Sequence, residues 1–318
     1  MKRKILIGLS LVLFFIVGVI VFNFAKNTKN TFRTRVEDKS NIKYLPMVEQ
    51  IGGISHGILD LSGKVDDTFV HHLEIGDSFN KFVNIANFLE GSRNFKLLTF
   101  VNFEQVDFRV DGELVDEYNF TLGSKEDIQI PVTLDKFHNG LNEVLFAVAI
   151  SPDKKLSDET RMASEMSHMI HLRTTIVIGE DKNIPEVEFA DVQLEDNAVG
   201  GVFISQDVGE LRLLPSTTVK QGDKLNLYMN VGTGKGTKAN QYALILLKDW
   251  KQVNIFEDTS VVYLDIPEGK HTWMPIELDF EEKGLKNVSA ILVENPYNAI
   301  SYMTSNSENS LRIGVTVE

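Results

Sequence analysis

The sequence predicts an all-β protein in which two tandem antiparallel β-sandwich domains follow an N-terminal transmembrane helix. Three observations support this prediction. Two ten-residue segments with the same pattern of glycine, aspartate, asparagine and apolar residues lie 146 positions apart. Apolar residues in the repeated blocks recur with a period of two, which is the period of a β-strand. Finally, an uncharged apolar run near the N-terminus is long enough to cross a membrane.

The repeat begins with two segments that share the frame G-D-x-[FL]-N-x-[FY]-x-N-[IV]. GDSFNKFVNI starts at Gly76 and GDKLNLYMNV starts at Gly222. Three more pairs follow in the same order: LLTFVNFEQVDF with LILLKDWKQVNI, IPVTLDKFHNGLNEVLFAVAISP with MPIELDFEEKGLKNVSAILVENP, and LRTTIVI with LRIGVTV. Four collinear blocks indicate that one domain has been copied. The sequence therefore predicts one sandwich at 46–180, a linker at 181–188 and a second sandwich at 189–318.

The repeated blocks have the composition and spacing of short strands. Phe79, Lys81 and Val83 point to one face, and the intervening residues point to the other. Asp111 and Gly112 are typical of a tight hairpin turn. Turn signals recur about every 8–12 residues, which favours an antiparallel sandwich. This layout resembles the immunoglobulin-like or fibronectin-like sandwiches of bacterial surfaces, a likeness of fold that lacks the Cys…Trp…Cys pattern.

The N-terminus predicts a membrane anchor. A short basic tail at 1–4 precedes an uncharged run at 5–24. Twenty residues of helix rise about 30 Å, which matches the hydrocarbon core of a bilayer. We expect a single-pass signal anchor, a polar stalk at 25–45 and a body outside the cell membrane. The alternative is cleavage of the run as a signal peptide, which would give a secreted protein.

Composition excludes several classes of protein. The chain has no cysteine, so it has neither disulfides nor thiolate ligands. Residues 1–43 carry nine of the 32 Lys/Arg and two of the 45 Asp/Glu. The remainder, 44–318, therefore has 23 basic and 43 acidic residues and a net charge of −20. A body with this charge repels nucleic acid, and we expect no nucleic-acid partner.

The sequence shows no arrangement typical of an enzyme. No serine or histidine stands in a nucleophile-elbow frame, and no nucleophile with a base and an orienting residue is recognisable. We therefore expect no catalytic residues and no cofactor. Asp77 and Asp223, with the asparagines of the same segments, could supply oxygen ligands to Ca²⁺, but turn and strand hydrogen bonds are the simpler role.

One stretch carries the ligands of a soft metal. RMASEMSHMIHL places five such side chains within ten residues: Met162, Met166, His168, Met169 and His171. Thioether and imidazole ligands suit copper. The structural alternative is that these methionines fill gaps beneath a long loop.

These features predict a membrane-anchored, extracytoplasmic protein that binds or assembles at a bacterial cell surface. Its expected partner is a protein or a cell-wall polymer, contacted through sandwich loops and edge strands. The alternative is an accessory subunit that carries a ligand or a metal for a membrane complex. A carrier predicts a concave pocket between the domains, lined with aromatic or charged side chains.

Overall fold

The computed structural model describes residues 52–154, 156, 169–179, 183–196, 200–210, 212, 214–298 and 307–318. Every regular element in these ranges is a β-strand, and most pairings are antiparallel, which confirms the all-β prediction. No helix among these residues is long and apolar enough to span a membrane. The predicted anchor at 5–24 and stalk at 25–45 lie outside the described ranges.

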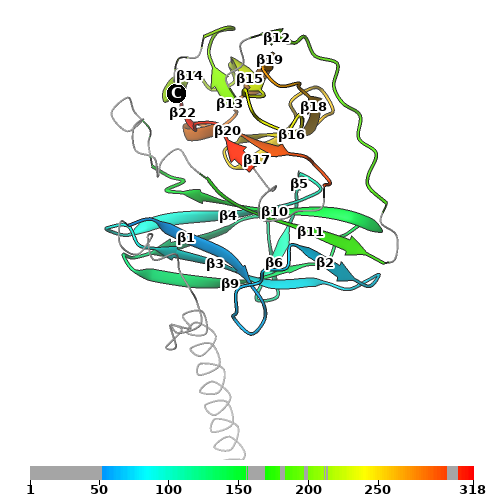
Figure 1. Ribbon diagram of the computed structural model, residues 1–318. Coiled ribbons are helices and arrows are strands. Elements are labelled where there is room, and N and C mark those ends of the chain that lie inside the picture. Colours follow the sequence, from blue (N-terminus) through cyan, green and yellow to red (C-terminus); the bar gives the residue numbers. More distant parts are fainter. Residues whose placement is uncertain are drawn as a thin grey trace, which may run out of the picture.

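Two sheets form the first sandwich (Figure 1). The outer sheet has the order β1-β3-β9-β6-β7; the inner sheet has the order β2-β11-β10-β4-β5, with β8 paired to β4. Their bounds are β1 Ile54–Leu59, β2 Val70–Leu73, β3 Phe79–Asn87, β4 Arg93–Val101, β5 Glu104–Gln105, β6 Phe108–Val110, β7 Glu113–Val115, β8 Tyr118–Leu122, β9 Glu126–Leu134, β10 Gly140–Ile150 and β11 Met169–Ile178.

Two more sheets form the second sandwich. Its outer sheet has the order β12-β19-β15-β13; its inner sheet has the order β14-β22-β20-β16-β17, with β18 paired to β16 and β21 to β20. Their bounds are β12 Glu195–Asp196, β13 Gly201–Ser205, β14 Ser216–Val219, β15 Lys224–Gly232, β16 Gln241–Lys248, β17 Lys251–Val253, β18 Val261–Asp265, β19 Lys270–Asp279, β20 Gly284–Glu294, β21 Ser307–Asn309 and β22 Ile313–Val317.

The strand pairings of the two sandwiches correspond. In the first, β3 pairs with β9, and β10 lies between β4 and β11. In the second, β15 pairs with β19, and β20 lies between β16 and β22. Each inner sheet ends in a parallel pair, β2 with β11 and β14 with β22. Long segments of the two sandwiches therefore have the same strand topology.

The alternation predicted from sequence is confirmed in β3. Phe79 and Val83 lie in the core of the first sandwich. Lys81 shares their face, and its Nζ is 2.6 Å from a carboxylate oxygen of Asp66. A turn at Asp111 and the following glycine, both at positive φ, joins β6 to β7, as the sequence predicted.

The central strands of both inner sheets are buried on two faces. In β10, Val144 and Phe146 point into the core of the first sandwich, whereas Leu145 and Ala147 point the opposite way. The outward-pointing residues meet their counterparts from β16 and β20 of the second sandwich. The body is therefore a stack of four sheets, with the two inner sheets in contact (Figure 1). We call the contact between the inner sheets the seam.

Charge introduced into either sandwich core should abolish folding of that sandwich. Val144 and Val288 are both 0% exposed and occupy matched central strands. Val144→Asp or Val288→Asp buries an unpaired carboxylate and should cost more than about 4 kcal/mol, measured by urea unfolding. Thr218→Asp, at an exposed position of β14, should cost less than about 1 kcal/mol. Equal losses in all three variants would contradict this placement of the cores.

Candidate functional site: the seam between the sandwiches

The seam has an apolar centre. Fifteen buried side chains form it: Leu98, Phe100, Phe103, Leu141, Leu145, Ala147, Ala149, Ala243, Ile245, Leu247, Trp250, Val261, Ile291, Val293 and Tyr297. Phe103 lies edge-on to Tyr297, with ring centroids 5.2 Å apart, and also contacts Tyr263. Val187 packs against this cluster, so the predicted linker is itself attached to the seam. The burial of these fifteen side chains fixes the orientation of one sandwich relative to the other.

Two hairpin turns insert aromatic rings into the seam. Asn102 and Phe103 join β4 to β5 with φ of 52° and 69°. Asp249 and Trp250 join β16 to β17 with φ of 50° and 69°. Positive φ in two successive residues is the geometry of a two-residue hairpin, but it is unfavourable for bulky aromatic residues. Packing of both rings in the seam offsets this backbone cost.

Gln105 and Gln252 bind each other across the seam. The backbone N–H of Gln105 donates to Oε1 of Gln252 at 2.5 Å, and the backbone N–H of Gln252 donates to Oε1 of Gln105 at 2.7 Å. Their amide groups donate in turn to the opposite hairpins, from Gln252 to the carbonyl of Phe103 at 3.0 Å and from Gln105 to that of Trp250 at 3.2 Å. The two glutamines thus satisfy backbone groups on both sides.

Two buried arginines also cross the seam in opposite directions. Arg173 donates to the carbonyls of Glu294 and Asn295, at 2.7 and 3.0 Å. Arg312 donates to the carbonyls of Ser151 and Pro152, at 3.0 and 3.1 Å. Each guanidinium therefore holds the chain segment that leaves the long central strand of the other sandwich.

The two arginines differ in their charge environment. Arg173 forms an ion pair with Glu143 at 2.9 Å, with side chains 3% and 1% exposed. Burial raises the pKa of Glu143 to about 7, against the opposing effects of Arg173 and Thr175. Arg312 has no ion pair among the described residues, and burial lowers its pKa to about 10. The carbonyl oxygens of the first sandwich are its main polar partners.

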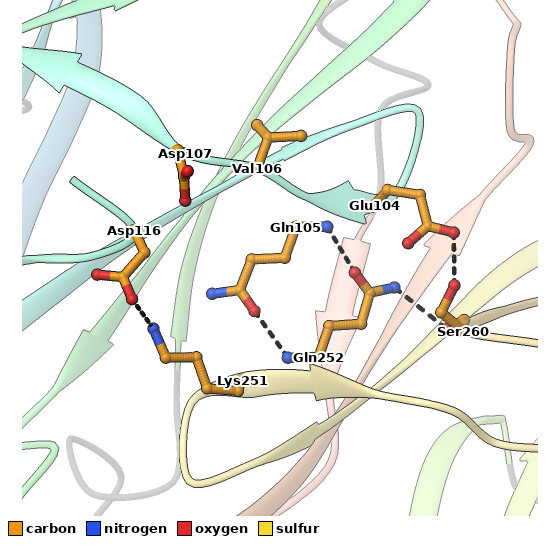
Figure 2. A pocket seen from close by; sticks show the side chains of 8 residues that line it. All are labelled: Glu104, Gln105, Val106, Asp107, Asp116, Lys251, Gln252 and Ser260. Atoms are coloured by element: carbon orange, nitrogen blue, oxygen red, sulfur yellow. Dashed lines mark hydrogen bonds and ion pairs between the residues drawn. The ribbon is translucent and has the colours of Figure 1, made fainter. Parts of the chain in front are cut away.

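A groove of about 390 Å³ opens at the rim of the seam (Figure 2). It is lined by Glu104, Gln105, Val106, Asp107, Asp116, Lys251, Gln252 and Ser260. Lys251 binds Asp116, and the hydroxyl of Ser260 donates to Glu104 at 2.5 Å. The carboxylate of Asp107 also lines the groove (Figure 2). Most polar groups of the groove are therefore already paired with one another.

The structure places only part of the predicted soft-metal set. Met162, Met166 and His168 lie outside the described residues. Met169 and His171 begin β11 and share one face of it. Within the described part of the chain, no group of three or more His, Asp or Glu side chains could hold a metal.

His171 nevertheless has the state that a metal ligand requires. Its Nε2 is shielded from solvent and has no hydrogen-bond partner among the described residues. Burial lowers the pKa of His171 to about 4, and nearby His56 of β1 lowers it further, against a backbone hydrogen bond with Ser307. The imidazole is therefore neutral at physiological pH. Sequence analysis missed His56, because it lies more than a hundred residues away in the chain.

The strand asparagines have structural roles. Asn84 donates its amide to the carbonyl of Ile128 at 3.0 Å, and Asn230 donates to that of Thr272 at 3.3 Å. Each bond joins two strands of an outer sheet. Asp77 accepts the backbone N–H of Glu74 in a turn. These observations favour the hydrogen-bonding role over calcium ligation.

Comparison with known proteins yields distant likenesses in fold. No protein-family model and no curated protein matches the chain. A CARDB domain from Pyrococcus furiosus, solved with di-metal ions, is 12% identical, covering 40% of this chain and 96% of its own, with a TM-score of 0.25. A structure described as BspA_C_mut is 9% identical, covering 83% of this chain and 98% of its own, with a TM-score of 0.23. Red sea bream transglutaminase is also 9% identical and has a TM-score of 0.23, but 83% of this chain covers only 31% of that enzyme.

Removing one seam ring should destabilise the protein far more than removing an exposed ring. Phe103 is 1% exposed and Phe256 is 40% exposed. Phe103→Ala should cost about 3–5 kcal/mol, because it leaves a cavity between the sheets. Phe256→Ala should cost less than about 1 kcal/mol in the same urea titration. Similar values for the two variants would show that the seam contributes little to stability.

Proposed function

We propose that the chain is a membrane-anchored, extracytoplasmic protein of a bacterial cell surface that binds a protein or a cell-envelope partner. Its two sandwiches are immunoglobulin-like copies of one domain, carried on the stalk at 25–45. The corresponding strand pairings and the matched contacts of the seam support the duplication. The anchor at 5–24 and the net charge of 44–318 support the membrane attachment and the absence of a nucleic-acid partner.

The seam suits a protein that presents binding surfaces at fixed positions. Apolar packing and buried hydrogen bonds join the sandwiches, so loops on both move together. When a partner binds two such loops, little conformational entropy is lost, because the loops are already ordered. Binding by a pre-assembled scaffold is therefore favoured over closure of two mobile domains around a ligand.

The observation that carries the proposal is an ordered loop with apolar side chains. In the loop between β1 and β2, Leu61 is 68% exposed and Val65 is 53% exposed. Oδ1 of Asp60 accepts the backbone N–H of Ser62 at 2.8 Å and that of Lys64 at 3.0 Å. These bonds fix the loop before any contact is made. Apolar side chains on a fixed loop are suited to recognition.

A second candidate function is that of a subunit carrying a soft metal. The observation that favours it is the solvent-shielded Nε2 of His171, which has no hydrogen-bond partner among the described residues, with His56 nearby and Met169 on the same strand face. Two imidazoles and a thioether suit Cu(I). Metal carriage and partner binding are compatible, since this cluster and the loop of Leu61 use different residues.

Surface exposure and loop recognition can be tested in the same cells. Protease added to intact, wall-stripped cells should digest the body, because it lies outside the membrane. Photo-cross-linkers placed at the positions of Leu61 and Val65 should capture a defined envelope component. Leu61→Ser with Val65→Ser should reduce capture by a cross-linker in the neighbouring turn at least about tenfold, because apolar contact is lost.

Leu114→Ser is the matched control, since Leu114 is 54% exposed on another hairpin. It should leave capture unchanged. Full protection from protease would overturn the proposed location, and equal capture by both serine variants would overturn the role of the loop.

Copper binding tests the second candidate. The soluble body, 46–318, should compete with a chelator for Cu(I), and Zn²⁺ should compete poorly. Because the folded pKa of His171 is about 4, its contribution to affinity should persist as the pH falls from 7 to 5. Unperturbed histidine would already be largely protonated at pH 5.

The triple variant Met162→Leu, Met166→Leu, Met169→Leu should retain the fold and lose most Cu(I) affinity, since leucine has a similar volume and no sulfur. His171→Leu should do the same. Unchanged affinity in both variants, or none in the parent protein, would leave these residues with a packing role alone.

A further inference from the structure

The polar contacts of the seam are related as they would be by a two-fold axis. Gln105 and Gln252 stand at the same position of two matched sequence blocks, and they exchange equivalent hydrogen bonds. Arg173 and Arg312 likewise stand at the same position of two blocks, and each binds carbonyls of the opposite sandwich. An interface in which each partner uses the same patch is isologous, and it is self-complementary.

The same symmetry relates two contacts at the rim. Glu104 and Lys251 each precede the paired glutamine of their own sandwich. Asp116 and Ser260 are also equivalent. The first leucine of each matched block pairs with a residue of a neighbouring strand, and Asp116 and Ser260 each lie two residues before that partner. Lys251 binds Asp116, and Glu104 accepts a hydrogen bond from Ser260. The same two positions are therefore in contact twice, once through an ion pair and once through a hydrogen bond from a hydroxyl to a carboxylate.

This difference in chemistry decides which sandwiches are compatible. When a first sandwich meets a second, Lys251 forms ion pairs with Asp116 and Glu117, and Glu104 accepts a hydrogen bond from the hydroxyl of Ser260. If two first sandwiches met in the same way, Glu104 would face Asp116 twice, and like charges at contact are repulsive. If two second sandwiches met, Lys251 would face Ser260 twice, with no ion pair.

Each sandwich also has an apolar core of its own. One buried cluster contains only residues from β3 to β11, and another contains only residues from β13 to β22 with the turns between them. The seam is a third cluster to which both contribute. The two halves are therefore organised as two subunits joined by a linker.

We propose that the seam face of each sandwich is a docking surface for a sandwich of the same fold, and that the two rim positions direct first sandwiches to second sandwiches. Within one chain, the second sandwich covers the seam face of the first. In an exchange between molecules, the second sandwich of another copy of this chain takes that place. The proposal rests on the duplication and is independent of the membrane location and of the partner at the loop of Leu61.

Cutting the linker tests the docking surface. A protease site replacing 180–182 allows the folded full chain to be cleaved, and native mass spectrometry then identifies the pairs. We expect a one-to-one complex of first and second halves. When two cleaved copies of different mass are mixed in mild urea and the urea is removed, first halves should pair with second halves of either copy. Halves that separate after cleavage at micromolar concentration would overturn the proposal.

Two variants test the rim positions. Lys251→Glu should weaken the cleaved complex at least about tenfold, because a carboxylate then faces Asp116 and Glu117. Glu104→Lys should create pairs of two first sandwiches, since it replaces each repulsion with Asp116 by an ion pair. Glu113→Lys makes the same charge change on exposed β7 and should create none.

In the parent protein, pairs of two first halves or two second halves should be rare. If they are as abundant as pairs of a first and a second half, the proposed role of the rim is wrong. It is also wrong if the Glu104→Lys protein behaves like the Glu113→Lys protein. The Lys251→Glu measurement needs no refolding, so it decides the question even where separated halves do not refold.

Discussion

The contact between the two inner sheets is the constraint on which the rest of the structure depends. A sheet in a two-layer sandwich needs apolar residues on one face only. Here β4, β10, β16 and β20 must be apolar on both faces, because each separates a sandwich core from the seam. The long apolar stretches of these strands follow from that requirement. The contact between the sheets also holds Phe103 and Trp250 at positive φ, because both rings pack in the seam.

Apolar packing brings the sheets together, but the buried polar groups determine how they meet. Hydrophobic contact is non-directional and would tolerate several angles between two flat faces. The exchanged bonds of Gln105 and Gln252, and the opposed guanidinium contacts of Arg173 and Arg312, are formed at one relative position. Any other position would leave these groups buried without partners, at a cost comparable to a lost hydrogen bond for each.

The seam also affects what the surface can do. Its rim groove is lined with charged side chains, as a ligand carrier would require, yet Glu104, Asp116 and Lys251 already have partners. The loop held by Asp60 differs, because its apolar side chains are exposed and Asp60 binds backbone N–H groups of the loop itself. A fixed body with apolar loop tips is better matched to contact with another macromolecule than to enclosure of a small ligand.

The sequence alone determined the strands of the matched blocks and the hairpin at Asp111, since period-two alternation and turn residues act locally. It showed that Gln105 matches Gln252 and that Arg173 matches Arg312, but it gave no reason for polar residues at those positions. Only the tertiary structure decided that these side chains meet across a seam and that His56 lies near His171. The physical reason is that alternation shows which residues share a face, whereas what covers that face depends on contacts between segments far apart in the chain.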